Sequence, residues 1–208
     1  MLNINIKKLE IKTNEKKLVD ISFEIKDSTA LIGESGSGKS LTLKALLNLL
    51  PSSFEVKKDI DSNFELNYDS IGFIPQNPFT SLSMMTKITN QFFCDEKRKE
   101  EVLNLVCLDK NVLKKFPSQL SGGQIQRVVI AIALSRDIKI LLLDEPTTAL
   151  DEENKKNIID LINEIKKHLN ILILFVTHDI NSIQNICKDI IILKNGKKKE
   201  KGLTNDIL

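Results

Sequence analysis

The stretch GESGSGKS, residues 33–40, satisfies the phosphate-loop pattern G-x-x-x-x-G-K-[ST] at every position. The apolar run Ala30–Ile32 leads into it, and leucines at helical spacing follow from Leu41. A strand, a glycine-rich loop and a helix in this order bring backbone N–H groups and the positive end of a helix to one point. Lys39 is expected to reach the outer phosphates of a ligand, and the Ser40 hydroxyl to coordinate Mg²⁺. The motif therefore predicts a phosphate-binding site.

Length and composition bound the class of protein. The 208 residues are 41% hydrophobic and 28% charged, which is ordinary for a soluble globular chain of one domain. A net charge of +2 gives no electrostatic reason to expect nucleic acid as a partner. No apolar run approaches the roughly 20 residues that span a bilayer, and the start of the chain lacks a signal-peptide pattern. Three cysteines without metal spacing indicate reduced thiols, so we expect a cytoplasmic protein.

Apolar periodicity predicts an α/β fold. Alternation in residues 2–6 and 19–25 indicates two half-buried strands of a small antiparallel layer. Residues 158–169 have the pattern of an amphipathic crossover helix, and residues 51–70 are weakly patterned. Strands buried on both faces, as in a parallel sheet, are predicted where the sequence is continuously apolar. These runs are residues 29–32, 71–74, 140–143, 171–176 and 190–193.

Residues 77–135 have a different character and are predicted to form an inserted helical subdomain. They contain a Ser/Thr/Met-rich segment, a charged helix from Asp95 that stops at Phe116-Pro117, and an apolar helix from Ser121 that carries Arg136 on its stripe. The prediction is thus a single domain, residues 1–208. Its core is a P-loop α/β fold with a mostly parallel sheet and a small antiparallel β layer, formed by residues 1–76 and 136–208.

A pair of carboxylates ends one of the predicted buried strands, in ILLLDEP, residues 140–146. Asp144 is expected at the sheet edge that faces the phosphate loop, where it is placed to hold Mg²⁺ directly or through water. Glu145 is a candidate to orient or deprotonate an attacking water. The alternative is a strand end with two solvated acids, which the complete phosphate loop makes the weaker interpretation.

The most specific marker in the chain is LSGGQIQR, residues 120–127. With the phosphate loop and DEP it makes the sequence resemble the ATP-binding subunit of an ABC transporter. Ser121, Gly122 and Gly123 are expected to precede a helix N-terminus, where they offer N–H donors and a hydroxyl to a γ-phosphate. The resemblance implies a homo- or heteromeric head-to-tail dimer, with ATP and Mg²⁺ between one phosphate loop and the opposite subunit's Ser121 region. It also implies integral membrane permeases, an extracytoplasmic substrate-binding protein, and a peripheral location at the cytoplasmic face of the membrane, with no nucleic acid.

The same resemblance assigns roles to individual residues. Gln76 matches the Q-loop glutamine that senses Mg²⁺, Ala149-Leu150-Asp151 the D-loop at the dimer seam, and His178 the switch histidine that contacts the γ-phosphate. The candidate catalytic residues are Glu145, His178 and Gln76, and the candidate Mg²⁺ ligands are Ser40, Gln76 and Asp144. The candidate ATP-binding residues are Gly33, Glu34, Ser35, Gly36, Ser37, Gly38, Lys39, Ser40 and Leu41. The candidates for binding the ATP of the opposite subunit are Ser121, Gly122, Gly123, Gln124 and Asp151.

Within this family, the sequences around the phosphate loop, Gln76–Leu82 and DEPTTALD are most similar to importers of peptides and nickel. The alternatives are an exporter-type ATPase and a soluble non-transport ABC ATPase, although the latter usually has a coiled-coil insertion or two cassettes. The chain departs from the family pattern at three places. Residues 9–17 contain no aromatic side chain to stack on adenine, Asp27-Ser28 replaces a Gly-Glu turn, and the sequence stops at Leu208 where those importers continue.

An apolar cluster follows Gln76 in an otherwise polar segment and is expected to contact the permease. Its members are Phe79, Leu82, Met84 and Met85. Methionine is flexible enough to adapt to a partner helix. The alternative is that these four side chains form the core of the helical subdomain.

Overall fold

The computed structural model describes residues 1–148 and 150–207. The strands are β1 (Ile4–Lys12), β2 (Lys17–Ile25), β3 (Ser28–Ile32), β4 (Glu55–Ser62), β5 (Ile71–Ile74), β6 (Ile140–Asp144), β7 (Leu172–Thr177), β8 (Asp189–Lys194) and β9 (Lys197–Leu203). The helices are α1 (Lys39–Leu46), α2 (Glu96–Leu105), α3 (Gly122–Leu134), α4 (Glu152–His168) and α5 (Thr204–Ile207). Short 3₁₀ turns occupy Pro78–Ser81, Ile88–Gln91, Lys110–Lys114, Pro117–Gln119 and Ile180–Ser182. No described helix is both long and apolar enough to cross a bilayer.

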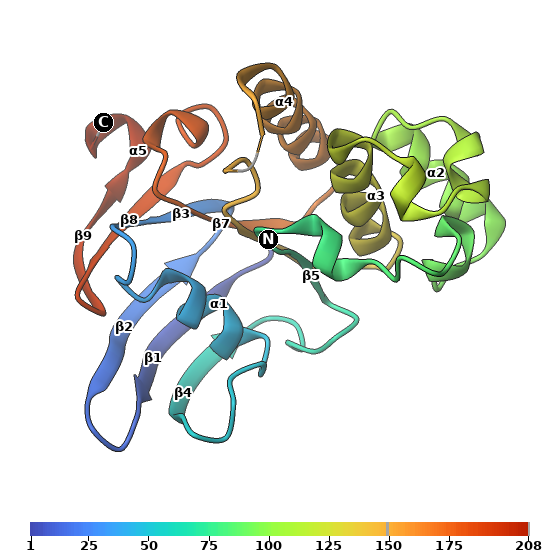
Figure 1. The fold of residues 1–208 in the computed structure, drawn as a ribbon. Helices are drawn as coiled ribbons and strands as arrows, with labels where there is room; N and C mark the ends of the chain where they lie inside the picture. Colours follow the sequence, from blue (N-terminus) through green and yellow to red (C-terminus); the bar gives the residue numbers. More distant parts are fainter. Residues whose placement is uncertain (149, 208) are drawn as a thin grey trace.

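The nine strands in the described part of the chain form one sheet in the order β4-β1-β2-β9-β8-β3-β7-β6-β5. Its centre is parallel, because β3 pairs with β7 and β8, and β6 pairs with β7 and β5. Every residue of β3, β6 and β7 is buried, as expected for strands that are covered on both faces. Figure 1 shows α3 and α4 on one face and α1 on the other. The prediction of buried parallel strands is therefore confirmed for β3, β6 and β7, whereas β5 and β8 are parallel as predicted but leave Phe73 and Ile192 half-buried.

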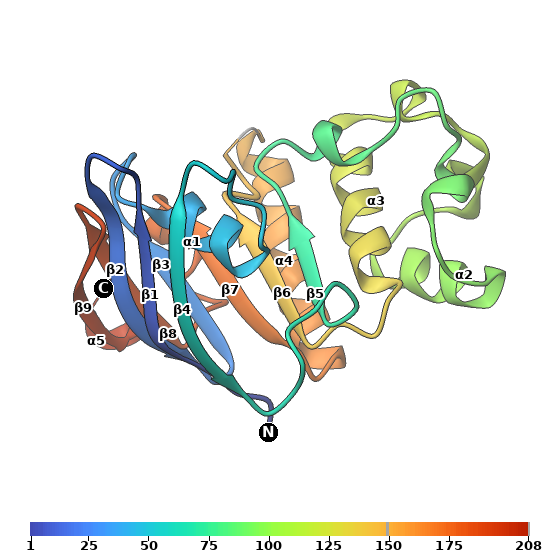
Figure 2. The same cartoon turned by 90° about the horizontal axis from the view of Figure 1, so that it is seen from below.

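The predicted antiparallel layer is the curled end of the same sheet. β1 pairs antiparallel with β2 and β4, and one parallel bridge between Asp20 and Lys197 joins β2 to β9. The curl carries β1 and β2 around α1 (Figure 2), so Ile6 and Leu31 share a core with Leu43 of α1. The helix behind the phosphate loop is thereby fixed between the two parts of the sheet.

Residues 77–135, here called the helical part, extend to one side of the sheet (Figures 1 and 2). The helix that begins after Asp95 ends at Leu105, so the prediction of an end at Phe116-Pro117 was wrong. The cause is Cys107, whose φ of 55° turns the chain out of the helix. Arg136 lies beyond the end of α3 and is not part of its apolar stripe.

Two arginines cap α2 and α3 reciprocally. Arg98 of α2 donates from Nη2 to the carbonyl O of Leu134 at 2.7 Å, at the end of α3. Arg127 of α3 donates from Nη1 to the carbonyl O of Val106 at 2.7 Å, at the end of α2. A cation at a helix C-terminus satisfies free carbonyl groups and stabilises the helix dipole. The two helices are thus cross-linked as an antiparallel pair.

The unusual turn Asp27-Ser28, at the start of β3, ties this strand to α4 and to the start of β8. Lys166 of α4 donates to Ser28 Oγ at 2.7 Å and lies 3.0 Å from Asp27 Oδ1. Lys188 also pairs with Asp27, and its backbone N–H donates to Ser28 Oγ at 3.1 Å. The departure from the Gly-Glu pattern therefore creates a polar cross-link between α4 and the start of β8.

Candidate functional site

The phosphate loop closes tightly between β3 and α1. Gly36 and Gly38 have φ values of 77° and 105°, a region that other residues seldom adopt. A Cβ on Gly33 would lie 2.3 Å from the carbonyl O of Leu193, so the loop packs directly on β8. This curled backbone, followed by the N-terminus of α1, fits a bound phosphate group.

The two side chains that end the phosphate loop are both held in place. Lys39 is 5% exposed, and its Nζ donates to the carbonyl O atoms of Gly33 at 2.7 Å and Glu34 at 3.1 Å. Ser40 Oγ donates to Asp144 Oδ1 at 3.1 Å, which joins α1 to the end of β6. The pKa of the Asp144 carboxyl is raised above its ordinary value, mainly because the group is buried. A hydroxyl beside a buried carboxylate is a set of hard oxygen donors, so Ser40 and Asp144 fit Mg²⁺.

Glu145 has a backbone conformation that is rare for a residue with a side chain. Its φ is 47°, which costs on the order of 1–3 kcal/mol. Its N–H donates to the carbonyl O of Val176 at 2.8 Å, and Thr148 Oγ1 donates to its Oε2 at 2.9 Å. His178 Nδ1 lies 3.0 Å from the same oxygen, and Lys39 Nζ lies 4.0 Å from Oε1. The carboxylate is therefore fixed beside the phosphate loop.

These groups surround one open hollow of about 580 Å³. It is lined by Glu34, Ser35, Gly36, Gly38, Lys39, Ser40, Leu41, Gln76, Glu145, Thr148 and His178. The carboxyl ends of neighbouring parallel strands meet at this edge, which explains why residues far apart in the sequence converge here. Three predicted residues, Gly33, Ser37 and Asp144, are not among the lining residues. Gly33 is hydrogen-bonded to the lining residue Lys39, and Asp144 to the lining residue Ser40. Thr148 lines the hollow but was not predicted, although its place three residues after Glu145 was a signal.

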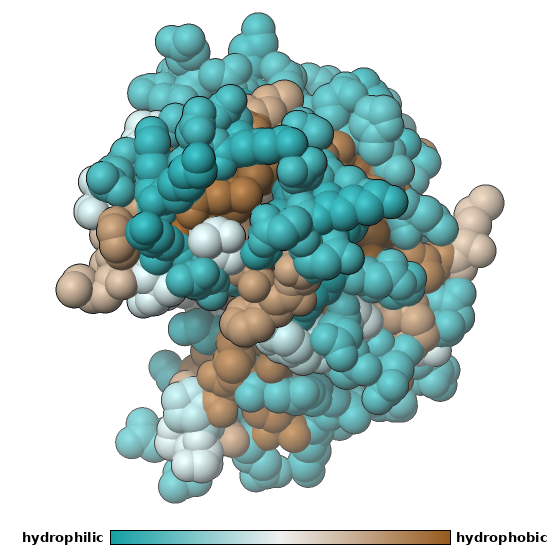
Figure 3. Space-filling model, turned by 90° about the vertical axis from the view of Figure 1, so that its right-hand side faces the viewer, coloured by the Kyte–Doolittle hydropathy of each residue, from teal (hydrophilic) through white to brown (hydrophobic). Residues whose placement is uncertain are grey.

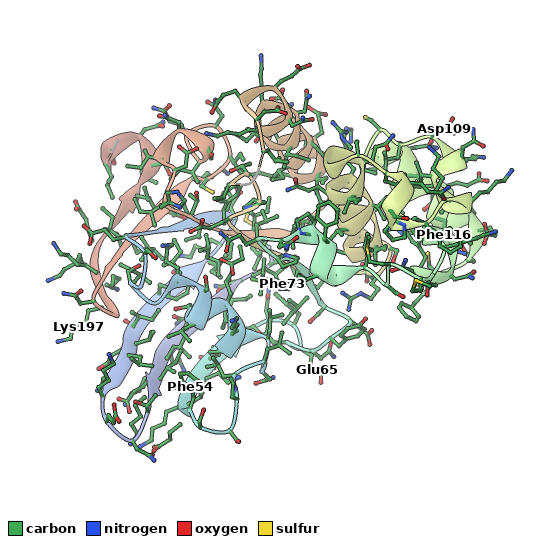
Figure 4. All side chains as sticks on the ribbon, viewed as in Figure 1. Phe54, Glu65, Phe73, Asp109, Phe116 and Lys197 are labelled. Carbon is green, nitrogen blue, oxygen red and sulfur yellow. The ribbon has the colours of Figure 1, made fainter. Side chains whose placement is uncertain are left out.

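No aromatic side chain is among the residues that line the described hollow. Phe54 and Phe73 are half-buried against the core that contains α1, and Phe116 lies in the helical part (Figure 4). None of these three rings therefore lines the hollow beside the phosphate loop.

The signature segment forms the start of α3 outside the hollow. Ser121 Oγ accepts a bond from the N–H of Gln124 at 3.3 Å, and the Gln124 side chain accepts one from the N–H of Ser121 at 3.1 Å. This reciprocal capping box fixes the first turn of α3. Ser121 and Gly122 are exposed there, so a ligand held by a second molecule has access to them.

The predicted D-loop residue Asp151 is the N-cap of α4. It accepts a bond from the N–H of Asn154 at 2.8 Å and is exposed. A Cβ on Gly123 would lie 3.1 Å from Asn154 Oδ1, so the starts of α3 and α4 touch. The residues predicted to act on the opposite subunit thus lie near one another, apart from the hollow. Ala149, another residue of the predicted D-loop, lies outside the described residues.

The geometry describes a P-loop nucleotide site, and comparisons with known proteins define its family. Residues 17–148 match the ABC transporter family. The energy-coupling factor transporter ATP-binding protein EcfA2 of Ligilactobacillus salivarius is 37% identical over 86% of this chain and 70% of that protein. The nickel import system ATP-binding protein NikD of Staphylococcus aureus is 34% identical over 97% of this chain and 88% of that protein.

Other relatives and a solved structure agree with this result. The oligopeptide transport ATP-binding protein OppD of Bacillus subtilis is 34% identical over 91% of this chain, which spans 61% of that protein. The structure of cbiO1 from Clostridium perfringens has a TM-score of 0.84 and 26% identity, and the match covers 98% of this chain and 89% of that one. The chain belongs to the ABC transporter family, as an ATP-binding subunit with ATPase activity.

Proposed function

We propose that this ABC ATPase binds and hydrolyses ATP in the hollow beside the phosphate loop. The observation that carries the proposal is the Glu145 carboxylate, fixed 3.0 Å from His178 and 4.0 Å from Lys39. The loop N–H groups and Lys39 would hold the phosphates. Ser40, Asp144 and Gln76 would hold Mg²⁺, which when bound neutralises charge on the phosphates.

In this proposal the acid and the histidine act on the terminal phosphate. Glu145 would orient the attacking water and accept its proton, and Thr148 fixes the carboxylate through its 2.9 Å hydrogen bond. His178, which is exposed at the rim of the hollow, would contact the γ-phosphate.

The variant Lys39→Met tests the site, because it removes the ammonium group and keeps an apolar side chain as long as the carbon stem of lysine. ATP affinity measured by titration calorimetry should fall at least about tenfold, since charge-assisted hydrogen bonds contribute about 1.5–3 kcal/mol each. Unchanged affinity would refute the assignment.

None of the signature residues 120–127 lines the hollow of the same chain. This separation supports a head-to-tail dimer of ATPase subunits. Ser121, Gly122, Gly123 and Gln124 would complete the ATP site of the opposite subunit, with Asp151 at the seam. A helix N-terminus with exposed N–H groups is suited to a γ-phosphate. The proposal holds for a homodimer and for a heterodimer.

We also propose that the helical part is an inserted subdomain that contacts an integral membrane permease. Phe79 and Met84 are exposed, and Met85 is 89% exposed, so three of the four predicted contact residues are available to a partner. Leu82 is 7% exposed and packs in the core, so the prediction was wrong for that residue. Figure 3 shows the face that lies on the right in Figure 1, and apolar patches are visible there between polar side chains. Exposed apolar groups of this kind mark protein contacts.

Transport activity with the double variant Met84→Ser, Met85→Ser tests this contact. Both side chains are exposed, so the isolated chain should keep its ATPase activity and its Tm. Assembly with the permease, or transport by the complex, should fail. Unfolding of the isolated variant, or full transport with it, would contradict the contact.

We propose that the transporter is an importer of peptides or nickel, located at the cytoplasmic face of the membrane and served by an extracytoplasmic binding protein. Support comes from the names of relatives, which include import proteins for nickel and methionine and a transport protein for oligopeptides. Deleting the gene should lower uptake of radioactive nickel or of a labelled peptide, and a copy with Glu145→Gln should not restore it. Normal uptake of both would favour the exporter-type alternative.

A further inference from the structure

Gln126 of α3, which has no role in the proposed chemistry, is bonded to the loop that carries Glu145. Its side chain is 2% exposed, and its Nε2 donates to the backbone carbonyl O of Pro146. Pro146 directly follows Glu145. Leaving a buried polar group without a partner costs about 1–3 kcal/mol. The loop is therefore strongly constrained to stay in contact with this amide.

A second contact places the same face of α3 on the start of α4. Gly123 precedes Gln126 by three residues, and residues at this spacing share one side of a helix. Gly123 lies so close to Asn154 that a Cβ would stand 3.1 Å from its Oδ1. One face of the N-terminal turns of α3 thus contacts both Pro146 and Asn154.

The Glu145 backbone needs such support. A residue with φ of 47° is strained, and strain of this kind persists only where the surrounding contacts hold it. The N–H of Glu145 is held by the carbonyl O of Val176 at 2.8 Å. Gln126 holds the carbonyl O of the next residue, Pro146. Together they fix the orientation in which the carboxylate faces His178.

We propose that Gln126 is a positioning residue for ATP hydrolysis. It holds Pro146 so that the Glu145 carboxylate points into the hollow, and it links that carboxylate to α3. Since the arginine caps join α2 to α3, a displacement of the helical part reaches Glu145 through this amide. Gln126 does not line the hollow, so it acts through the loop and touches no ligand. The inference rests on the proposed role of Glu145.

Gln126→Met tests the inference, because methionine has a similar length and volume and no donor. We expect kcat to fall about 10–100-fold, since a displacement near 1 Å can cost a factor of 10². ATP affinity should stay within about twofold, because the contacts of Lys39 are untouched. Gln91→Met is the matched control. It removes amide bonds to Ser83 and Thr86 in the helical part and should leave kcat unchanged.

The outcomes separate a positioning role from a merely structural one. A structural role would lower the Tm of Gln126→Met and leave kcat at the wild-type value below that temperature, which would overturn the proposal. If Gln126→Met does not fold, Gln126→Asn keeps the amide but is one carbon too short to reach Pro146. It should show the same loss of kcat, and wild-type turnover would again overturn the proposal. Glu145→Gln is measured beside them. Full activity in that variant refutes the proposed function, whereas its loss with normal Gln126 variants refutes this inference alone.

Discussion

Replacing Glu145 by Gln separates ATP binding from hydrolysis. The change keeps the shape of the side chain, and the amide oxygen still accepts the bond from Thr148, but the anionic base is lost. A general base contributes about 10²–10⁴-fold to a rate, which corresponds to about 3–5 kcal/mol of activation free energy. Binding should persist, because the Lys39 contacts with the loop do not involve Glu145. The variant also removes the electrostatic repulsion between the Glu145 carboxylate and the phosphates of ATP.

The assay is steady-state phosphate release, with size-exclusion chromatography in Mg-ATP. The Glu145→Gln protein should lose most of its turnover and accumulate as an ATP-bound dimer, because hydrolysis no longer opens it. Glu164→Gln is the control, since this exposed acid lies on α4 outside the hollow. Wild-type turnover in Glu145→Gln would refute the assignment of the base.

Three further results are expected. GTP should compete with ATP within about tenfold in a displacement titration, since the described lining of the hollow offers no aromatic ring and base stacking contributes about 1–3 kcal/mol; a larger preference for ATP would reveal another base platform. Burial opposes ionisation of Asp27, but hydrogen bonds from Lys188 and Lys166 outweigh it and hold its pKa below the ordinary value. Their stabilisation is therefore present above the unfolded-state pKa of about 4 and is lost as pH falls through the lower folded pKa. In urea unfolding, Asp27→Asn should cost about 1 kcal/mol near neutral pH, less in acid, and an equal cost at all pH values would contradict this. Burial raises the pKa of Cys187 to about 12, so mass spectrometry should find iodoacetamide on the exposed Cys107 and not on Cys187 of the native chain, and labelling of both would contradict the burial.

The parts of the site that depend on neighbouring residues could be predicted from the sequence. The phosphate loop needs only its own glycines and the flanking strand and helix, so the local sequence is enough to predict it at Gly33 to Ser40. Asp144 and Glu145 followed because a buried strand ends at them.

Contacts between distant segments could not be predicted. The bond from Gln126 to Pro146 joins a helix to a loop 20 residues away, and no local pattern indicates it. The early end of α2 depends on the left-handed backbone of Cys107, a residue without turn character. Leu82 and Met85 belong to the same apolar cluster in the sequence, and only the packing of the helical part buries one and exposes the other.

The central claim is that each ATP site is completed by the Ser121 region of a second molecule. Mixing two inactive variants tests it directly: Lys39→Met has a damaged phosphate loop and an intact signature segment, and Ser121→Arg has the reverse. Random pairing makes half of the dimers mixed, each with one complete site, so ATPase activity should return to about one quarter of the wild-type value. No gain on mixing, with an active wild type measured alongside, would contradict the shared site.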